Sequence, residues 1–139
     1  MIDLRNLELK NDMREFYLHT KVLVIGHNKV SRDAVFTELD NFMKRNGLFH
    51  ILLGGSKRVN MYAKEYAKMN NLLYKSYTPN YKDLKSRALG ACHKIMISEA
   101  DYTIAFWNET NDRTLYLLNK SREANTPTKI VFFSTQAGN

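Results

Sequence analysis

Short apolar runs alternate with polar stretches along this chain, and five of the runs have the character of β-strands. They are continuous and rich in β-branched or aromatic residues, which is typical of strands covered on both faces. The predicted strands are Lys21–Ile25, Phe49–Leu53, Leu72–Tyr77, Tyr102–Phe106 and Lys129–Phe133.

Between these runs the apolar residues recur with helical spacing. The first helix is expected around Val35–Met43, with Ser31 as its N-cap and Gly47 as its terminator. Three further helices are expected around Val59–Ala67, Leu84–Met96 and Arg113–Ala124. Several apolar helix residues fit a buried core, among them Met61, Met69, Cys92 and Met96.

Strict alternation of strands and helices predicts an α/β fold. We expect a Rossmann-like, doubly wound sheet of about five mainly parallel strands, with right-handed crossovers and helices on both faces. Residues 1–20 are expected to form an N-terminal appendage, and residues 21–139 a single domain. In the appendage Leu9, Met13, Phe16 and Tyr17 predict a short amphipathic helix, which would cover a sheet edge or meet a partner subunit.

Ligands of such sheets bind beyond the carboxyl ends of the strands, where the connections diverge to opposite faces. The segments that follow the first four predicted strands are all polar. They are Gly26–Lys29, Gly54–Arg58, Thr78–Tyr81 and Trp107–Thr114. We therefore expect the functional site among these loops.

The loop after the second strand is the most informative of the four. Gly54 and Gly55 end an apolar run and lead into Lys57 and Arg58, where helical spacing begins. Glycines allow backbone N–H groups to approach a ligand, and the N-terminus of a helix favours an anion. The expected ligand group is a phosphate of a nucleotide-like molecule. The spacing of a Walker loop is missing, so the loop predicts binding and says little about a reaction.

The net charge of +7 comes from one part of the chain. Nine Lys or Arg residues lie between Ser56 and Lys94 against two acids, Glu65 and Asp83, and this segment accounts for the whole excess. The electrostatic field of such a basic segment attracts anionic small molecules or nucleic acid. A solvated helix face that favours solubility has the same composition.

Other features restrict the class of protein. No run approaches the roughly 18 apolar residues of a membrane span, and residues 1–20 lack the apolar block of a secretory signal. The single cysteine, Cys92, excludes an internal disulfide and fits a reducing compartment. We therefore expect a cytoplasmic protein, and from the lack of an apolar span we expect no membrane partner. We expect no metal site and no cofactor, because metal-ligand spacing is missing from the four histidines, His19, His27, His50 and His93.

Four motifs, three at strand ends and one on a predicted helix, occur in an order that is typical of one protein superfamily. They read Ile25–Asn28, Leu53–Asn60, Cys92–Met96, and Ala105–Phe106 with Asp112–Thr114. In these motifs the chain resembles the SLOG superfamily of Rossmann-type nucleotide-binding proteins, in particular its YspA-like branch and the LOG proteins. The similarity covers about Lys21–Phe133. Compared with the family pattern, Cys92-His93 replaces an Arg-Asn pair and Arg113 replaces a glycine.

The resemblance implies a protein, often dimeric or of higher homo-oligomeric state, that binds a nucleotide or a nucleotide-derived signal. Trp107 would stack a base, or it is a partly buried anchor. Together, the loops and the resemblance predict the following ligand-binding residues: Gly26, His27, Asn28, Lys29, Gly54, Gly55, Ser56, Lys57, Arg58, Asn60, His93, Trp107, Asn108, Asp112, Arg113 and Thr114.

No catalytic residue is expected. The LOG enzymes, which the chain resembles, cleave the N-glycosidic bond of nucleoside monophosphates with a Glu that follows the Gly-Thr loop; a carboxylate there stabilises the oxocarbenium ion or activates water. Here no acid occurs between Thr114 and Glu123. Glu109 and Asp112 are possible substitutes, although Asp112 fits better as the N-cap of the last helix.

The first hypothesis is therefore a protein that senses or sequesters its ligand without turnover. The compact size and the altered motifs suggest a phage or mobile-element protein, and a sharper version is a decoy that captures a nucleotide immune signal. The alternatives are a nucleic-acid-binding protein that uses the basic face of residues 56–94, an N-glycosidase of LOG type, and a protein-interaction module that kept only the scaffold.

Overall fold

The computed structural model describes residues 19–77, 82, 88–109 and 112–134, and its strands form one parallel sheet. The strand order is β3-β2-β1-β4-β5. The strands are β1 (Thr20–Gly26), β2 (Phe49–Leu53), β3 (Tyr74–Ser76), β4 (Tyr102–Trp107) and β5 (Thr128–Phe132). The predicted Rossmann-like, doubly wound fold is confirmed.

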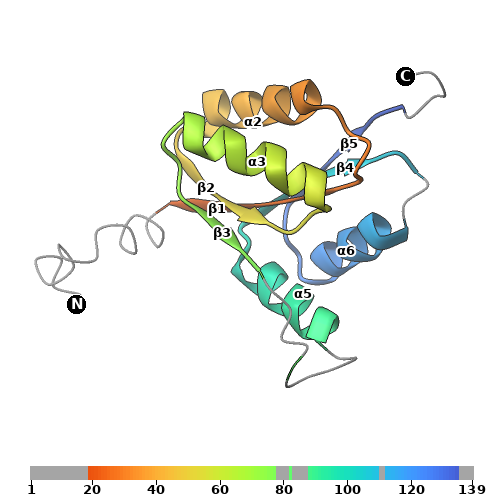
Figure 1. Cartoon of the computed structure of the whole chain (residues 1–139). Helices are drawn as coiled ribbons and strands as arrows, with labels where there is room; N and C mark the ends of the chain where they lie inside the picture. The colour runs from red at the N-terminus through yellow and green to blue at the C-terminus, as the bar shows by residue number, and fades with distance from the viewer. Residues whose placement is uncertain (1–18, 78–81, 83–87, 110–111, 135–139) are drawn as a thin grey trace, which may run out of the picture.

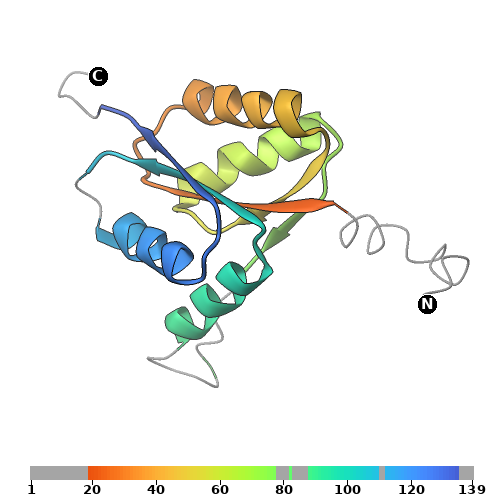
Figure 2. The same cartoon turned by 180° about the vertical axis from the view of Figure 1, so that it is seen from behind.

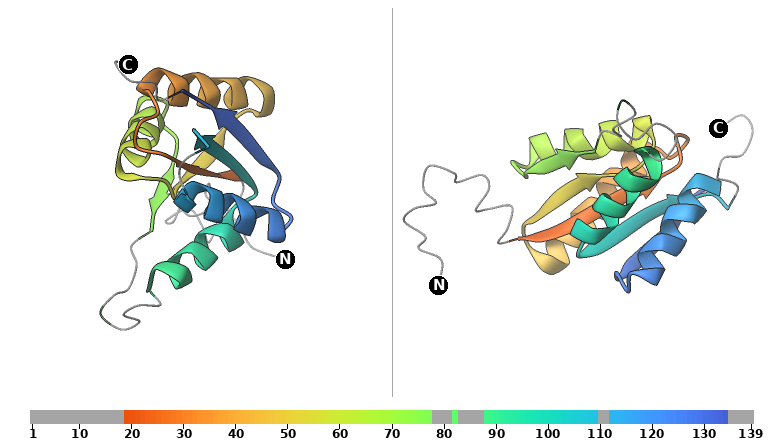
Figure 3. Two further views of the ribbon diagram at one scale, coloured as in Figure 1. Left: turned by 90° about the vertical axis from the view of Figure 1, so that its right-hand side faces the viewer. Right: turned by 90° about the horizontal axis from the view of Figure 1, so that it is seen from below.

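Two pairs of helices cover the sheet. The helices α2 (Arg32–Asn46) and α3 (Lys57–Met69) lie on one face, and α5 (Ala88–Glu99) and α6 (Asp112–Glu123) lie on the other (Figures 1 and 2). Figure 3 shows the same layering from two further sides. The chain starts in the centre at β1, winds outward to β3, and then crosses to β4 on the opposite side of β1. The switch point of the sheet therefore lies between β1 and β4.

Alternate residues of β1 enter two separate cores. Val22 and Val24 pack under α2 and α3, whereas Leu23 and Ile25 pack against α5 and α6, and all four are fully buried. Cover on both faces explains the continuous apolar runs of the sequence. The edge strands β3 and β5 are only partly buried, so the expectation of full cover holds for β1, β2 and β4.

The caps of α2 are those that the sequence predicts. The Ser31 hydroxyl oxygen accepts a hydrogen bond of 3.0 Å from the Ala34 N–H, and the Gly47 N–H donates to the Met43 carbonyl oxygen at 2.8 Å. Gly47 has a φ of 80°, which favours glycine.

Some element boundaries differ from the expectation. The strand predicted at Leu72–Tyr77 is shorter, because Asn71 has a φ of 55° and the Leu72 N–H donates to the Ala67 carbonyl oxygen in the turn that leaves α3. Thr20, placed in the appendage, belongs to β1, and the predicted amphipathic helix lies outside the described residues. The same holds for the helix start expected at Leu84. Within the described part of the chain, no helix has both the length and the hydropathy of a membrane-spanning segment.

Candidate functional site

The segments that follow β1 and β2 form one unit at the carboxyl edge of the sheet. The Ser56 N–H donates to the Gly26 carbonyl oxygen at 3.2 Å, and the Arg58 N–H donates to Asn28 Oδ1 at 3.0 Å. Both bonds follow from parallel pairing of β1 with β2, which brings the two strand ends side by side. The structure therefore joins the predicted residues of these two loops.

Close packing explains the two glycines after β2. A Cβ atom on Gly54 would lie 2.6 Å from Leu23 Cδ1 and 2.9 Å from Met96 Sδ. A Cβ atom on Gly55 would lie 3.1 Å from the Gly26 nitrogen. A side chain at Gly55 would therefore press on the backbone of β1, whereas one at Gly54 would force the Leu23 and Met96 side chains to move.

The amides of these glycines have acceptors inside the protein, which differs from the expectation that they face a ligand. The Gly54 N–H donates to the Val24 carbonyl oxygen at 3.1 Å, and the Gly55 N–H donates to Asn60 Oδ1 at 2.8 Å. Asn60 lies one turn into α3, and its side chain reaches back to close the loop. In this geometry Asn60 stabilises the turn, and ligand contacts fall to neighbouring side chains.

A basic cavity lies beside this turn. It has a volume of about 450 Å³ and is lined by Asn28, Lys29, Lys57, Arg58 and Met61. We call it the basic cavity below. Four of its five lining residues are among the predicted ligand-binding residues.

Met61 is the lining residue that sequence reasoning missed. Its helical spacing placed it in the core, as it did Met69, but these side chains are 55% and 64% exposed. Met96 and Cys92, by contrast, are buried as expected. The available signal for Met61 was its position, because it lies three and four residues after Arg58 and Lys57 and so shares their side of the helix.

The cations of the basic cavity have no acidic partner among the described residues. Lys29, Lys57 and Arg58 make no ion pair with any carboxylate that the structure describes. The cavity also adjoins the first turn of α3, whose N-terminal dipole is positive. The potential in the cavity is therefore strongly positive.

Two neutral polar groups near the basic cavity have unused hydrogen-bonding capacity. Asn28 accepts a bond through Oδ1, while its NH₂ group donates to none of the described residues. The Ser56 hydroxyl oxygen is buried and likewise has no partner among them, although Ser56 precedes α3 at the N-cap position. Both groups can donate a hydrogen bond to an anion.

The other predicted residues lie elsewhere. His93 lines a second cavity of about 520 Å³ between α5 and α6, on the opposite face of the sheet from α3. Its further lining residues are Gly90, Lys94, Ile97, Ser98, Tyr116, Lys120, Glu123 and Ala124. Burial, helped by the positive charge of Arg113, lowers the pKa of His93. His93 is therefore a buried neutral group near neutral pH, away from the basic cavity.

The residues around the end of β4 contribute packing. The Trp107 ring lies 5.9 Å from the Phe132 ring, centre to centre, and packs against the core under α5 and α6. Its indole Nε1 is buried without a partner among the described residues. This favours the anchor interpretation of Trp107. His27 similarly contacts the Phe133 ring, at 6.3 Å between ring centres.

The remaining predicted residues belong to the segment from β4 into α6. Asn108 is half-buried, Arg113 is exposed, and Thr114 is buried. Helix α6 begins at Asp112, one residue before the expected start, and the side chain of Asp112 lies outside what the structure describes. Glu109, the other substitute carboxylate, is exposed and has a φ of 71°.

The described basic residues of the segment 56–94 do not all lie on the same face of the sheet. Lys64 and Lys68 are exposed on α3, but Lys94 is exposed on α5 across the sheet. Lys85 and Arg87 lie outside the described residues. Among the described cations of the segment, Lys94 is therefore separated by the sheet from those on α3.

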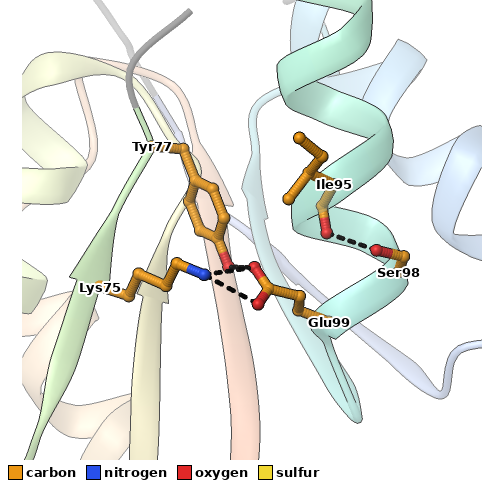
Figure 4. A network of polar contacts seen from close by, with 5 residues as sticks. All are labelled: Lys75, Tyr77, Ile95, Ser98 and Glu99. Atoms are coloured by element: carbon orange, nitrogen blue, oxygen red, sulfur yellow. Dashed lines mark hydrogen bonds and ion pairs between the residues drawn. The ribbon is translucent and has the colours of Figure 1, made fainter.

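Lys75, from the same segment, is neutralised at the β3 edge (Figure 4). Its Nζ lies 2.8 Å from both carboxylate oxygens of Glu99 at the end of α5, and the Tyr77 hydroxyl donates to Glu99 Oε1 at 2.7 Å. Burial alone would raise the pKa of Glu99, but the bonds from Lys75 and Tyr77 outweigh it and lower that pKa. This network ties β3 to α5.

Neither a metal centre nor a reactive thiol is evident in the described part of the chain. It contains no group of three or more His, Cys, Asp or Glu side chains placed to hold a metal ion. Burial raises the pKa of the Cys92 thiol, and the charge of Arg113 opposes the shift only in part. Such a thiol is a core group rather than a nucleophile.

Comparison with models of known protein families, with curated proteins and with solved structures finds no significant match to this chain.

Proposed function

We propose that this protein binds a nucleotide or nucleotide-derived ligand at the carboxyl ends of β1 and β2, as a SLOG-type protein that senses or sequesters it without turnover. The observation that carries the proposal is the basic cavity of about 450 Å³, lined by three cations that pair with no described carboxylate. It lies at the carboxyl edge of the sheet, where parallel α/β sheets bind ligands, on the β2 side of the switch point between β1 and β4. A phosphate group is the common biological anion that fits this chemistry.

The proposal assigns the phosphate contacts to side chains. Arg58 offers a planar fork that donates two parallel hydrogen bonds to phosphate oxygens, and Lys29 and Lys57 act as point charges. The amides of Gly54 and Gly55 are already used within the loop, so the glycines shape the site and the cations hold the ligand.

The positions of the carboxylates support binding without turnover. The described lining of the basic cavity contains no Asp or Glu, and no acid occurs between Thr114 and Glu123 in the sequence. An N-glycosidase needs a carboxylate beside the scissile bond. This arrangement therefore favours a binding protein over an enzyme of LOG type.

A small ligand is also favoured over nucleic acid. A nucleic-acid backbone is best held by cations that follow one continuous surface. Among the described cations of residues 56–94, Lys57, Arg58, Lys64 and Lys68 lie on α3, whereas Lys94 lies on α5, on the opposite face of the sheet. The three cations of the basic cavity, by contrast, line one local hollow.

The proposal extends to biological context. We place the protein in the cytoplasm as a homodimer or higher homo-oligomer, in the host cytoplasm if it is encoded by a phage. There, a protein that binds a nucleotide signal and does not consume it would act as a decoy against a defence system.

A thermal-shift panel tests the proposal. ADP-ribose, cyclic dinucleotides and nucleoside monophosphates are added to the full chain, and at least one of them is expected to raise Tm by about 5 °C or more at roughly 100 times its Kd. The double variant Lys57→Gln/Arg58→Gln should lose the shift. Lys68→Gln, which removes an exposed lysine of the same helix outside the cavity, should keep it. A panel with no stabilising compound contradicts the proposal.

A further inference from the structure

We infer that the ligand of the basic cavity carries at least two adjacent phosphoryl groups, and that it binds without an accompanying divalent cation. The inference rests on the proposed function and specifies its substrate class.

The first step is the charge of the cavity. Lys29, Lys57 and Arg58 contribute three positive charges, and none of them is paired with a carboxylate that the structure describes. A single phosphomonoester carries about −1.5 to −2 charges at neutral pH. One such group leaves roughly one cation uncompensated, whereas a second phosphoryl group supplies the missing negative charge.

The second step is the position of the donors. Lys57 and Arg58 begin α3, while Lys29 and Asn28 come from the loop after β1, so the donors approach the cavity from two elements. The bond from the Arg58 N–H to Asn28 Oδ1 holds these elements together, and the Asn28 NH₂ group donates to none of the described residues. Donors on both sides suit a ligand with phosphoryl oxygens directed both ways, as in a diphosphate.

The third step concerns metal ions. Proteins that bind metal–nucleotide complexes hold the metal through carboxylates, and none of the described lining residues is acidic. A magnesium ion on a diphosphate would cancel two of its charges and compete with the three cations. The free diphosphate should therefore bind more tightly than its magnesium complex.

The experiment is isothermal titration calorimetry on the full chain at pH 7.5. The probes are phosphate, pyrophosphate, AMP and ADP, each in EDTA and in excess magnesium, together with a short oligothymidine. We expect ADP to bind at least about tenfold more tightly than AMP, because one further charge-assisted hydrogen bond is worth that much. Pyrophosphate should likewise bind more tightly than phosphate, and this second comparison does not depend on a nucleotide base. Magnesium should weaken the binding of ADP.

A matched pair of variants assigns the effect to the cavity. Lys29→Gln should reduce the ratio of ADP to AMP affinity, since it removes one of the three cations. Lys68→Gln makes the same change of charge on α3 outside the cavity and should leave the ratio unchanged.

The outcomes separate the inference from the proposed function. AMP binding as tightly as ADP, or magnesium strengthening the binding, overturns the inference and leaves a nucleotide-binding protein. Binding of none of the phosphate compounds overturns the inference, and the proposed function falls with it if the thermal-shift panel of ADP-ribose, cyclic dinucleotides and nucleoside monophosphates also finds no stabilising compound. Tight retention of the oligothymidine, without binding of ADP or pyrophosphate, also overturns both and favours nucleic acid as the partner.

Discussion

Gly26 lies where β1 leaves the sheet, and its lack of a side chain lets β1 approach β4. A Cβ atom there would lie 2.8 Å from Phe106 Cβ and 2.9 Å from the Phe106 carbonyl oxygen. Phe106 belongs to a central strand, so these atoms have little freedom to move. The residue looks like part of a ligand loop in the sequence, yet the contact that requires glycine is one between strands.

Gly26→Ala should therefore destabilise the fold. We expect a loss of about 1–3 kcal/mol in the free energy of unfolding, the usual cost of overpacking in a core, measured by urea denaturation. Gly90→Ala is the control, because a Cβ added at this exposed helix position meets no atom within 4 Å. That variant should be neutral or gain up to about 1 kcal/mol, since alanine is the better helix former. Equal stability of the two variants would refute the packing argument.

At this scale the sequence predicted only some of the residues that gather at the site, and it did not predict what each of them does. Lys29, Lys57 and Arg58 were expected at the site from their place after strands, and they line one cavity. The hydrogen bond from the Gly55 N–H to Asn60 Oδ1 could not be predicted, because it depends on the orientation of the Asn60 side chain. The face on which Met61 lies was ambiguous for a similar reason, since an apolar residue at helical spacing fits either the core or a ligand cavity.

Among the elements, the central strands followed the sequence most closely. The strand Phe49–Leu53 has the predicted bounds, because burial on both faces makes its apolar run unbroken. The edge strand β3 kept only three residues, since a left-handed residue, Asn71, delays its start. Neither the strand order nor the division of basic residues between α3 and α5 could be predicted from a local pattern.

The contact between β3 and α5 should make stability depend on pH. The pKa of Glu99 is lower in the folded protein than its ordinary value of 4.5, so its contribution is present above that value and is lost as the pH falls through the folded pKa. The Lys75 side chain is 41% exposed, so solvent screens its ion pair with Glu99. We expect the pair to contribute about 1 kcal/mol to the free energy of unfolding.

Urea denaturation of Glu99→Gln at pH 7 and pH 3 measures this effect. The variant should be less stable than the wild type at pH 7, and the difference should shrink at pH 3. Glu123→Gln serves as the control, because Glu123 is 66% exposed in its ion pair with Lys120 and should matter little at either pH. A difference between wild type and Glu99→Gln that is the same at both pH values would contradict the assignment.

Across the whole molecule, each edge of the sheet is fastened to a helix by an ion pair. Glu99 of α5 holds β3 at one edge, and Glu38 of α2 pairs with Lys129 of β5 at the other. The two helices lie on opposite faces, so the pairs hold the sheet from both sides. Glu38 is the more buried of the two carboxylates, at 11% side-chain exposure.

A double-mutant cycle at Glu38 and Lys129 tests the second pair. Lys129→Gln should cost about 1–3 kcal/mol of stability, because it leaves a nearly buried carboxylate without its partner. Adding Glu38→Gln should recover part of that loss, which gives a coupling energy of about 1 kcal/mol in urea denaturation. Strict additivity of the two changes would show that the residues act independently.

The closed turn after β2 has a consequence for how fast a ligand is captured. Because Asn60 and Asn28 already hold the backbone of both loops, little ordering remains to be done when an anion arrives, and the entropic penalty of association is small. Encounter would then be governed by diffusion and by attraction between opposite charges, and the free and occupied forms would share nearly the same main-chain path.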